Sequence, residues 1–285
     1  KFTLIKINYI MNKILDGKTI SEEILMGLRQ KLANEENPPG LAAILVGEDA
    51  SSHLYVGLKK AACERCGINF SNYLFESNQT TEEVIKTIEF LNKDPEINGI
   101  LVQLPLPDNF DTEKIIEAID YKKDIDGFHP KNRADMDNCI YKILPPLPAG
   151  IKALVDSTEE IIENKEITIL CNHELFGSPF NCIWGEKNSV NIVTTKDNGW
   201  KEAVAKADIL IVSVGVAFLI EKEMIKDNCI IIDVGINKLE NDETVGDVNF
   251  ANVLDKVKHI SPVPGGVGPM TVAMLLDNLV KLKEL

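Results

Sequence analysis

The chain has 285 residues, of which 45% are apolar and 26% are charged. It is therefore long enough for one large globular domain or two smaller ones, and too apolar for intrinsic disorder. Its formal net charge of −14 argues against a nucleic-acid or anionic-membrane binder, because phosphate affinity requires clustered Lys and Arg. No apolar run approaches the roughly 20 residues of a membrane-spanning helix.

The first residues and the cysteines favour a cytoplasmic protein. Residues 1–10 are too short and too interrupted for a signal peptide, so we interpret them as an extension before Met11, which could be the natural start. Cys63 and Cys66 form a lone C-x-x-C motif, and we expect two thiols on one helical face rather than a redox or metal pair. Reduced thiols are the simplest interpretation of all six cysteines.

Helices and strands alternate along the first half of the chain. The apolar patterns predict, in order, a helix near 19–34, a strand over 41–47, a helix over 51–66, a strand over 69–75, a helix over 81–92 and a buried strand from Gly99. Thr80 or Thr81 can cap the third of these helices. Such alternation indicates parallel strands with both faces covered.

A proline-rich stretch, Pro145-Pro146-Leu147-Pro148, follows this block, and we place a domain boundary there. A helix is expected from about Ala149 to Ile162. The second block has predicted strands over 166–170, 190–193, 207–214 and 229–234, an order that resembles a Rossmann-type dinucleotide domain. A last helix is expected from about Met270 to Leu282, with Pro269 near its first position. The predicted fold class is therefore α/β, with two α/β domains.

Polar residues near these elements suggest chemistry. Tyr55 and Lys59 are four positions apart and share one face of a helix. Gln103 closes the apolar run that begins at Gly99, and Asp126 lies in the loop region beyond it. A tyrosine and a lysine on one helical face are also the ordinary composition of a solvated surface, and that alternative remains open from spacing alone.

Two glycine-containing loops are candidates for ligand binding. The turn Gly265-Gly266-Val267-Gly268 precedes the last helix and could let backbone approach a ligand, or could simply be a tight loop. After the strand ending at Leu170, the dinucleotide fingerprint G-x-G-x-x-G is expected, but Gly177 is its only glycine in place. The four histidines show no metal spacing, and serine-hydrolase, P-loop and zincin motifs are not found.

Several segments together resemble the bifunctional methylenetetrahydrofolate dehydrogenase/methenyltetrahydrofolate cyclohydrolase family. The resemblance runs from about Ile14 to Leu279. Its strongest parts are Tyr55-x-x-x-Lys59 and the segments 99–107, 123–130, 232–237 and 262–271.

The resemblance implies two domains flanking a cleft, usually in a homodimer. A folate-binding catalytic domain would comprise residues 11–148 and 269–285, and an NAD(P)-binding Rossmann-type domain residues 149–268. Tyr55 would stack on the folate ring system, Asp126 would bind its pterin edge, and Gln103 would hold and tune Lys59, the proton-transfer residue. No metal is required.

The remaining site residues are also implied by the resemblance. Further folate-binding residues would be Val102, Leu104, Pro264, Gly265, Gly266, Val267 and Gly268. The NAD or NADP site would comprise Cys171, Asn172, His173, Gly177, Thr195, Gly215 and Ile236.

The chain departs from the family pattern on the dinucleotide side. The family usually has Gly-Arg-Ser where this chain has Cys171-Asn172-His173, a His-Ser pair where it has Thr194-Thr195, and Pro-Cys-Thr-Pro at residues 145–148. The Arg commonly serves the NADP phosphates, so the choice between NAD and NADP stays open. Two alternatives also stay open: a monofunctional cyclohydrolase with impaired dinucleotide binding, and a non-catalytic folate-binding protein.

Overall fold

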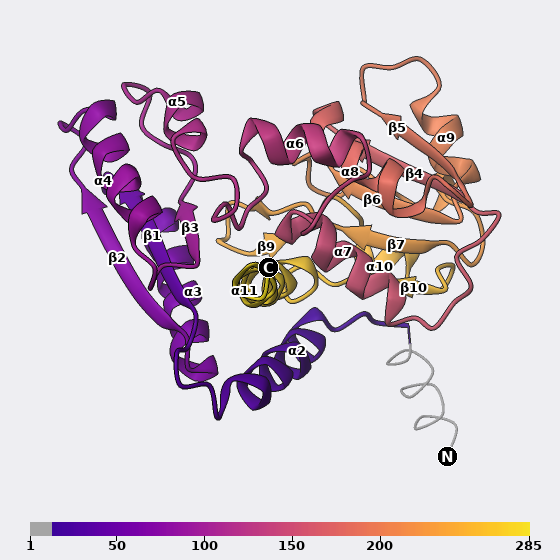
Figure 1. The fold of residues 1–285 in the computed structure, drawn as a ribbon. Helices are drawn as coiled ribbons and strands as arrows, with labels where there is room; N and C mark the ends of the chain where they lie inside the picture. The colour runs from indigo at the N-terminus through magenta and orange to yellow at the C-terminus, as the bar shows by residue number, and fades with distance from the viewer. Residues whose placement is uncertain (1–12) are drawn as a thin grey trace. The chain divides into compact units, whose positions relative to one another are not determined.

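The computed structural model describes residues 13–285, and the expected extension 1–10 lies outside this range (Figure 1). The chain forms two compact units, each made of two separate stretches. One unit comprises residues up to Ile20 together with Leu147–Thr271, and the other comprises Ser21–Pro146 with Val272–Leu285. We call the first the five-stranded unit and the second the three-stranded unit, after their parallel sheets.

The three-stranded unit is built on a sheet in the order β2-β1-β3. Its strands are β1 (Gly40–Val46), β2 (Asn69–Phe75) and β3 (Gly99–Val102), and both neighbours pair with β1 in parallel. Every residue of β1 is buried, as expected for a central strand covered on both faces.

Side chains alternate across β1 and divide the core of this unit into two layers. Leu41, Ala43 and Leu45 face one layer, and Ala42, Ile44 and Val46 face the other. The first layer is completed by α2 (Gly17–Leu32), α3 (Ala50–Cys66) and α11 (Val267–Lys283), and the second by α4 (Thr81–Lys93) and α5 (Thr112–Glu117). Another short helix, α6 (Pro130–Asp137), follows α5.

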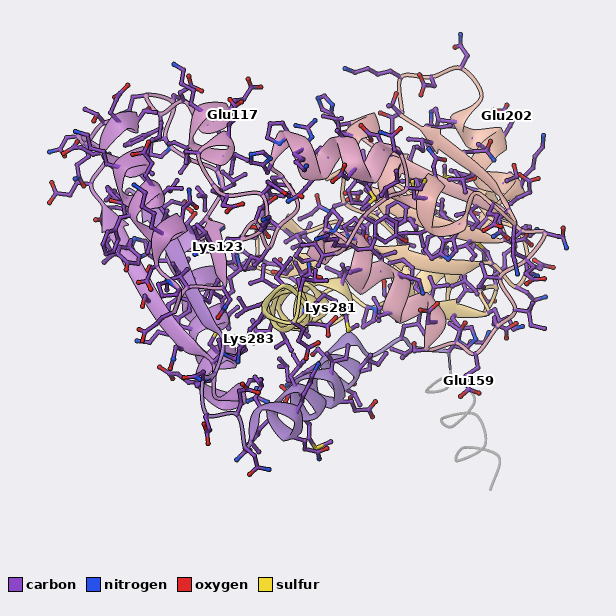
Figure 2. The ribbon with its side chains drawn as sticks, in the orientation of Figure 1. Glu117, Lys123, Glu159, Glu202, Lys281 and Lys283 are labelled. Atoms are coloured by element: carbon purple, nitrogen blue, oxygen red, sulfur yellow. The ribbon has the colours of Figure 1, made fainter. Side chains whose placement is uncertain are left out.

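Local sequence signals define the ends of these helices. Asp49 caps α3 by accepting a hydrogen bond from the Ser52 N–H, and Gly67 ends the helix in the left-handed region. Thr80 and Glu83 form a capping box at the start of α4, which confirms Thr80 as the cap. Lys281 and Lys283 lie near the end of α11 (Figure 2). The Lys283 ammonium donates to Glu35 Oε1 at 2.8 Å and to the carbonyl of Asn37.

The five-stranded unit has a parallel sheet in the order β10-β7-β6-β4-β5. Its strands are β4 (Glu166–Cys171), β5 (Ser189–Val193), β6 (Ile209–Ser213), β7 (Ile230–Asp233) and β10 (His259–Ile260). Its helices are α7 (Pro146–Asp156), α8 (Glu174–Trp184), α9 (Trp200–Lys206), the short 3-10 helix η1 (Lys222–Met224) and α10 (Phe250–Val253). A two-stranded hairpin, β8 (Asn237–Lys238) with β9 (Thr244–Val245), follows β7.

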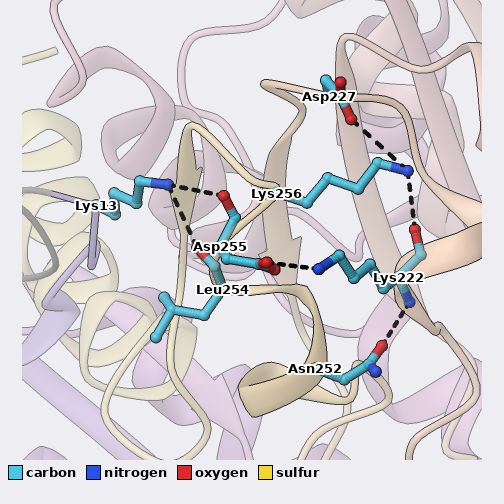
Figure 3. Close-up of polar contacts among 7 residues, drawn as sticks. All are labelled: Lys13, Lys222, Asp227, Asn252, Leu254, Asp255 and Lys256. Atoms are coloured by element: carbon cyan, nitrogen blue, oxygen red, sulfur yellow. Dashed lines mark hydrogen bonds and ion pairs between the residues drawn. The ribbon is translucent and has the colours of Figure 1, made fainter.

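Residues 13–15 extend this sheet beyond β10. Ile14 forms a parallel bridge with Ile260, and the Leu15 N–H donates to the Ile260 carbonyl at 2.8 Å. The Lys13 ammonium reaches the carbonyls of Leu254 and Asp255, both at 3.4 Å, just beyond α10 (Figure 3). A cation at the carboxyl end of a helix satisfies carbonyls that have no partner within the helix.

The predicted elements are confirmed, but two helices begin earlier than expected. The predicted helix from Ala149 to Ile162 is wrong at both ends, since α7 runs from Pro146 to Asp156 and the chain turns at Glu159, which has φ +57°. The predicted start at Met270 is also wrong, since α11 begins at Val267. A proline in the first turn of a helix loses no hydrogen bond, because that turn's N–H groups have no partner within the helix.

The cysteine expectation holds in part. Cys63, Cys66, Cys171 and Cys229 are buried free thiols, and Cys63 and Cys66 lie in the core of the three-stranded unit. Burial raises the pKa of Cys63 to about 12, so this thiol is chemically inert at neutral pH. Cys139 and Cys182 are not among the free thiols, so the expectation of six reduced cysteines holds for four.

Within residues 13–285, no helix is both long enough and apolar enough to cross a membrane. In the same range, no cluster of three His, Cys, Asp or Glu side chains could hold a metal ion.

Candidate functional site

Lys59 and Gln103, 44 positions apart in the chain, are in direct contact. The Lys59 ammonium on α3 donates to Gln103 Oε1 at 2.8 Å, immediately beyond the end of β3. Because the two residues are so far apart in the chain, the contact depends on the fold and not on sequence proximity. Lys59 is half-buried, so its ammonium is only partly hydrated.

The amide of Gln103 is fixed in one orientation. Its Nε2 donates to the Leu104 carbonyl at 2.8 Å, and its backbone N–H donates to the Ile44 carbonyl of β1 at 2.9 Å. The amide nitrogen is therefore used, and Oε1 is presented to Lys59. An amide accepts a hydrogen bond from the amine without adding a negative charge that would raise the pKa of Lys59.

Asp126 lies in a loop that is held from two sides. The buried carboxylate of Asp124 accepts the Gly127 N–H at 3.1 Å and the His129 N–H at 2.8 Å. From α11, the buried Asn278 amide donates to the carbonyls of Ile125 at 3.1 Å and of Leu144 at 2.7 Å. These hydrogen bonds fix the backbone on both sides of Asp126.

The electrostatics of Lys59 and Asp126 are coupled. Burial lowers the pKa of Lys59, and the charge of Asp126 partly opposes this shift. Burial raises the pKa of Asp126 to about 7, and the Lys59 ammonium partly opposes that shift. Both groups therefore change protonation closer to neutrality than they would in water, which is the property that proton transfer at neutral pH requires.

The other expected folate residues of the three-stranded unit have different surroundings. Tyr55 is on α3, one turn before Lys59, and its ring is 40% exposed. The Val102 side chain is buried in the core layer beneath β1 and α4, and Leu104 packs against the same layer. Tyr55 is thus available to a ligand through its ring, whereas Val102 is available only through its backbone.

The glycine-rich turn lies at the start of α11, in the five-stranded unit. Gly265 has φ +102° and its carbonyl accepts the Lys18 N–H at 3.0 Å. A Cβ on Gly17 would lie 1.8 Å from the Gly266 carbonyl oxygen, so the two backbones touch here. Pro264, Val267 and Gly268 adjoin this contact, which gives the turn a structural role of its own.

The strand order of the five-stranded unit reverses between β4 and β6. In open parallel sheets, ligands bind outside the carboxyl ends of the strands at such a reversal. Here Asn172 follows β4 and Val214 follows β6, and the Asn172 amide donates to the Val214 carbonyl at 2.5 Å. The two loops that flank the expected dinucleotide position are therefore joined by a side chain.

The residues around this position fit a dinucleotide in two respects. No side chain caps the start of α8 at His173, which leaves N–H donors for a phosphate. A Cβ on Gly177 would lie 2.6 Å from Ile192 Cγ2, so this glycine permits α8 to pack closely on β5. Close packing of helix on strand is the role of the third glycine in the dinucleotide fingerprint.

The remaining expected dinucleotide residues differ in exposure. Cys171 is fully buried, so only its backbone is available to a ligand. Thr195 follows β5 and is half-buried, Gly215 follows β6 with φ +76°, and Ile236 follows β7 and is 60% exposed. Gly215 and Ile236 therefore lie at the carboxyl ends of neighbouring strands.

Three buried polar residues that organise these loops were missed by the sequence interpretation: Asp124, Asn278 and Asp247. Asp124 lies in the segment 123–130 that carries part of the family resemblance, and its position two residues before Asp126 was the only sign in the sequence that it could have a role in this loop. Asn278 gave a signal as well, since it is a polar residue within the apolar stretch of the last helix.

The two sheets and the lysine–carboxylate site define a two-unit α/β enzyme with one dinucleotide-type unit. Two family descriptions match the chain: the tetrahydrofolate dehydrogenase/cyclohydrolase catalytic domain over residues 15–126, and its NAD(P)-binding domain over residues 145–285. The chain belongs to the tetrahydrofolate dehydrogenase/cyclohydrolase family.

Individual relatives are similar over nearly their full length. The bifunctional protein FolD of Nautilia profundicola is 42% identical over 94% of this chain and 96% of its own length. The corresponding protein of Bacillus subtilis is 41% identical, also over 94% of this chain and 96% of its own length. The crystal structure of the Campylobacter jejuni FolD enzyme is 39% identical, with a TM-score of 0.90 over 95% of this chain and 98% of that chain.

One similar structure carries a cofactor. The Trypanosoma brucei dehydrogenase–cyclohydrolase, complexed with NADP and an inhibitor, is 28% identical with a TM-score of 0.89. It covers 95% of this chain and 97% of that chain.

Proposed function

We propose that this enzyme of folate one-carbon metabolism catalyses two successive reactions. It oxidises 5,10-methylenetetrahydrofolate to 5,10-methenyltetrahydrofolate with NAD(P)+, and it hydrolyses the methenyl product to 10-formyltetrahydrofolate. The contact between Lys59 and Gln103 supports this proposal most directly, because pure binding of folate would not require an oriented amine with a lowered pKa.

In the hydrolytic reaction, Lys59 is the proton-transfer residue. Water attacks the carbon of the methenyl bridge, and the neutral Lys59 amine accepts a proton from the attacking water. The bond from that carbon to one ring nitrogen then breaks, and the protonated Lys59 donates a proton to the leaving nitrogen. One further proton is released to solvent. Gln103 keeps the amine in position, Tyr55 stacks on the ring system and Asp126 binds the pterin edge.

In the oxidative reaction, the five-stranded unit holds the dinucleotide. NAD(P)+ held there would supply the acceptor for the hydride that leaves the one-carbon bridge of the folate. The features supporting this role are the uncapped start of α8, Gly177 in the first turn of that helix, and the loops carrying Gly215 and Ile236. Val102, Leu104 and the turn from Pro264 to Gly268 would line the folate.

One observation favours a second candidate, a cyclohydrolase that binds dinucleotide poorly. Asn172 stands where relatives usually have Arg, and its amide is engaged with the Val214 carbonyl. A cationic phosphate ligand is therefore replaced by a neutral side chain that bonds within the protein.

Separate assays distinguish the two candidates. Purified protein is tested for oxidation of methylenetetrahydrofolate with NAD and with NADP, and for hydrolysis of methenyltetrahydrofolate. Hydrolysis without oxidation by either nucleotide would favour the cyclohydrolase, and loss of both reactions would contradict the proposal as a whole.

The substitution Lys59→Met tests the hydrolytic mechanism. It keeps the length of the side chain but removes the amine, so we expect hydrolysis to fall by about 100-fold or more. The matched control is Lys60→Met on the same helix, because Lys60 is exposed and lies 3.9 Å from Glu64. Hydrolysis by Lys59→Met at the rate of the control would remove Lys59 from the mechanism.

A homodimer is the assembly that we propose on the basis of the family resemblance. Light scattering after size exclusion tests it, and a mass near the 31.6 kDa of one chain would contradict it.

A further inference from the structure

Asp247 is a fully buried aspartate of the five-stranded unit that follows the β8–β9 hairpin. Its Oδ2 accepts the N–H groups of Val214 at 2.6 Å and Gly215 at 3.0 Å. Its Oδ1 accepts the Val216 N–H at 2.9 Å and the Asn237 amide at 2.9 Å. One carboxylate therefore connects the loop after β6 with the loop after β7.

Three successive N–H groups that point to one centre form an anion-binding concavity. Gly215 has φ +76°, the left-handed conformation that turns the chain so that these donors converge. In this protein the anion in the concavity is the carboxylate of Asp247 itself. The inner face of the loop is consequently occupied and cannot receive a phosphate group.

A second buried carboxylate holds Asp247 in place. Asp233, the last residue of β7, accepts the N–H groups of Gly235 at 3.0 Å, Asp247 at 3.1 Å and Val248 at 2.9 Å. A Cβ on Gly235 would lie 2.3 Å from the carboxyl carbon of Asp247, and a Cβ on Gly246 would lie 1.9 Å from Asp233 Oδ2. Glycine is thus required at both positions because the carboxylates approach the backbone closely.

The outer face of the same loops is exposed and partly apolar. Val216 is 48% exposed and Ile236 is 60% exposed, and both adjoin groups that bond to Asp247. The Val214 carbonyl accepts the Asn172 amide at 2.5 Å, which ties the loop after β4 to the same network. The carboxyl ends of β4, β6 and β7 are therefore joined through Asp247 and Asn172.

We propose that Asp247 is the positioning residue of the dinucleotide site. Its carboxylate accepts hydrogen bonds from the N–H groups of residues 214–216 and so fixes the conformation of this loop. The opposite, apolar face of the loop, together with Ile236, would then pack against a flat heterocyclic ring of the cofactor. This inference rests on the proposed function, because it assumes that the five-stranded unit binds NAD(P). Asp247 acts through the loops and does not itself touch the cofactor.

The substitution Asp247→Asn tests the proposal with little change in side-chain volume. The new amide nitrogen is a donor and would face N–H donors that the carboxylate now satisfies. In the full-length variant, we expect the KM for the dinucleotide in methylenetetrahydrofolate oxidation to rise about tenfold or more, because buried donors are left unsatisfied. Hydrolysis of methenyltetrahydrofolate, which uses Lys59 in the other unit, should stay within about twofold.

Thr168→Val is the matched control for general loss of stability. Thr168 is a buried polar residue of β4 in the same sheet, and its hydroxyl donates to the Ala203 carbonyl at 3.1 Å. The control should lower Tm without changing the dinucleotide KM. A dinucleotide KM in Asp247→Asn equal to that of the wild type, or raised no more than in Thr168→Val, would overturn the proposal.

Asn237→Ala provides a milder variant if Asp247→Asn does not fold. It removes the hydrogen bond to Asp247 and a longer one, of 3.4 Å, to the Val245 carbonyl from a half-buried side chain, and we expect a rise of about threefold in the same KM. An unchanged KM in a folded Asn237→Ala would also overturn the proposal. Wild-type protein that oxidises folate with neither nucleotide would overturn the oxidative half of the proposed function and this inference with it. An active wild type with unchanged variants would overturn the inference alone.

Discussion

Lys59 and Asp126, in the proposed folate site, illustrate how two residues adjust each other's protonation. Lys59 loses hydration by burial and its pKa falls, while the carboxylate of Asp126 holds that pKa up. The pKa of Asp126 rises to about 7 by burial and is held down by the ammonium. As pH rises through neutrality, Asp126 becomes charged and makes deprotonation of Lys59 harder. The two residues therefore titrate as a pair.

Removing the carboxylate should shift the pH dependence of hydrolysis. In Asp126→Asn the opposing charge is lost, so the pKa of Lys59 falls further below its ordinary value. If neutral Lys59 acts as the base, the rising limb of kcat against pH therefore moves to lower pH.

The control for this shift is Glu64→Gln, which removes an exposed charge on the same helix. It should leave the rising limb in place. If the rising limb of kcat against pH in Asp126→Asn is unchanged or moves to higher pH, the electrostatic coupling of Lys59 and Asp126 is contradicted.

At the scale of elements, α11 supports the loop that carries Asp126. Asn278 is 1% exposed, and its amide is the donor for the carbonyls of Ile125 and Leu144. The same helix supplies apolar residues to the core layer beneath β1. One helix thus contributes both to folding and to the geometry of the site.

The substitution Asn278→Leu should separate these two contributions. Leucine keeps the volume but leaves two buried carbonyls without their donor, so we expect the free energy of unfolding to fall by about 1–3 kcal/mol per lost bond. We also expect the KM for methenyltetrahydrofolate to rise severalfold because the loop loosens.

Asn92→Leu is the matched control in the same unit, since the Asn92 amide also makes two hydrogen bonds, donating to the Ala118 carbonyl at 2.8 Å and accepting the Asp120 N–H at 2.9 Å, and neither involves residues 124–129. Denaturant unfolding and hydrolysis kinetics of both variants provide the test. An equal rise in KM in the two variants would show that stability, and not the loop, controls binding.

Elements with strong apolar periodicity were predicted from the sequence, and shorter ones were not. The strand over 69–75 was predicted to the residue, and α4 to within one residue. By contrast, α5, α6, α10 and the β8–β9 hairpin were missed, because they are too short for periodicity to appear. The pairing of Lys59 with Gln103 was expected only through the family resemblance, since the two residues are far apart in sequence. The loops organised by Asp124 and Asp247 depend on backbone donors, which leave no trace in side-chain patterns.

At the scale of the whole chain, each unit is assembled from two separate stretches. Residues 13–15 pair with β10 through backbone hydrogen bonds, and residues 147–271 complete that unit. Residues 272–285 return to the three-stranded unit, where Leu275, Leu276, Leu279 and Val280 enter the core. The sequence interpretation placed residues 11–148 together in the folate unit, whereas residues up to Ile20 group with the five-stranded unit. The difference arises because an apolar pattern does not reveal which sheet edge a short segment joins.

Deleting residues 272–285 should abolish the three-stranded unit. The deletion removes five buried core residues, Ala273, Leu275, Leu276, Leu279 and Val280, and loss of even one buried leucine side chain costs about 2–5 kcal/mol. We expect the loss of hydrolysis and of one cooperative transition in calorimetry. Deletion of Glu284 and Leu285 alone is the control, because both are exposed. A folded, hydrolytically active protein ending at residue 271 would contradict the assignment of these residues to that core.

The return of α11 to the three-stranded unit also sets an order of events during synthesis on the ribosome. Domains generally fold as units while the chain emerges. All strands of the five-stranded unit have been made by Ile260, whereas the core around β1 waits for residues beyond 271. We therefore expect the part of the chain made first to be the part that finishes folding last, and pulse proteolysis of nascent chains stalled after residue 271 would detect it. Lys59, the proposed proton-transfer residue, is synthesised early, yet the core of its unit is completed only when the last helix arrives.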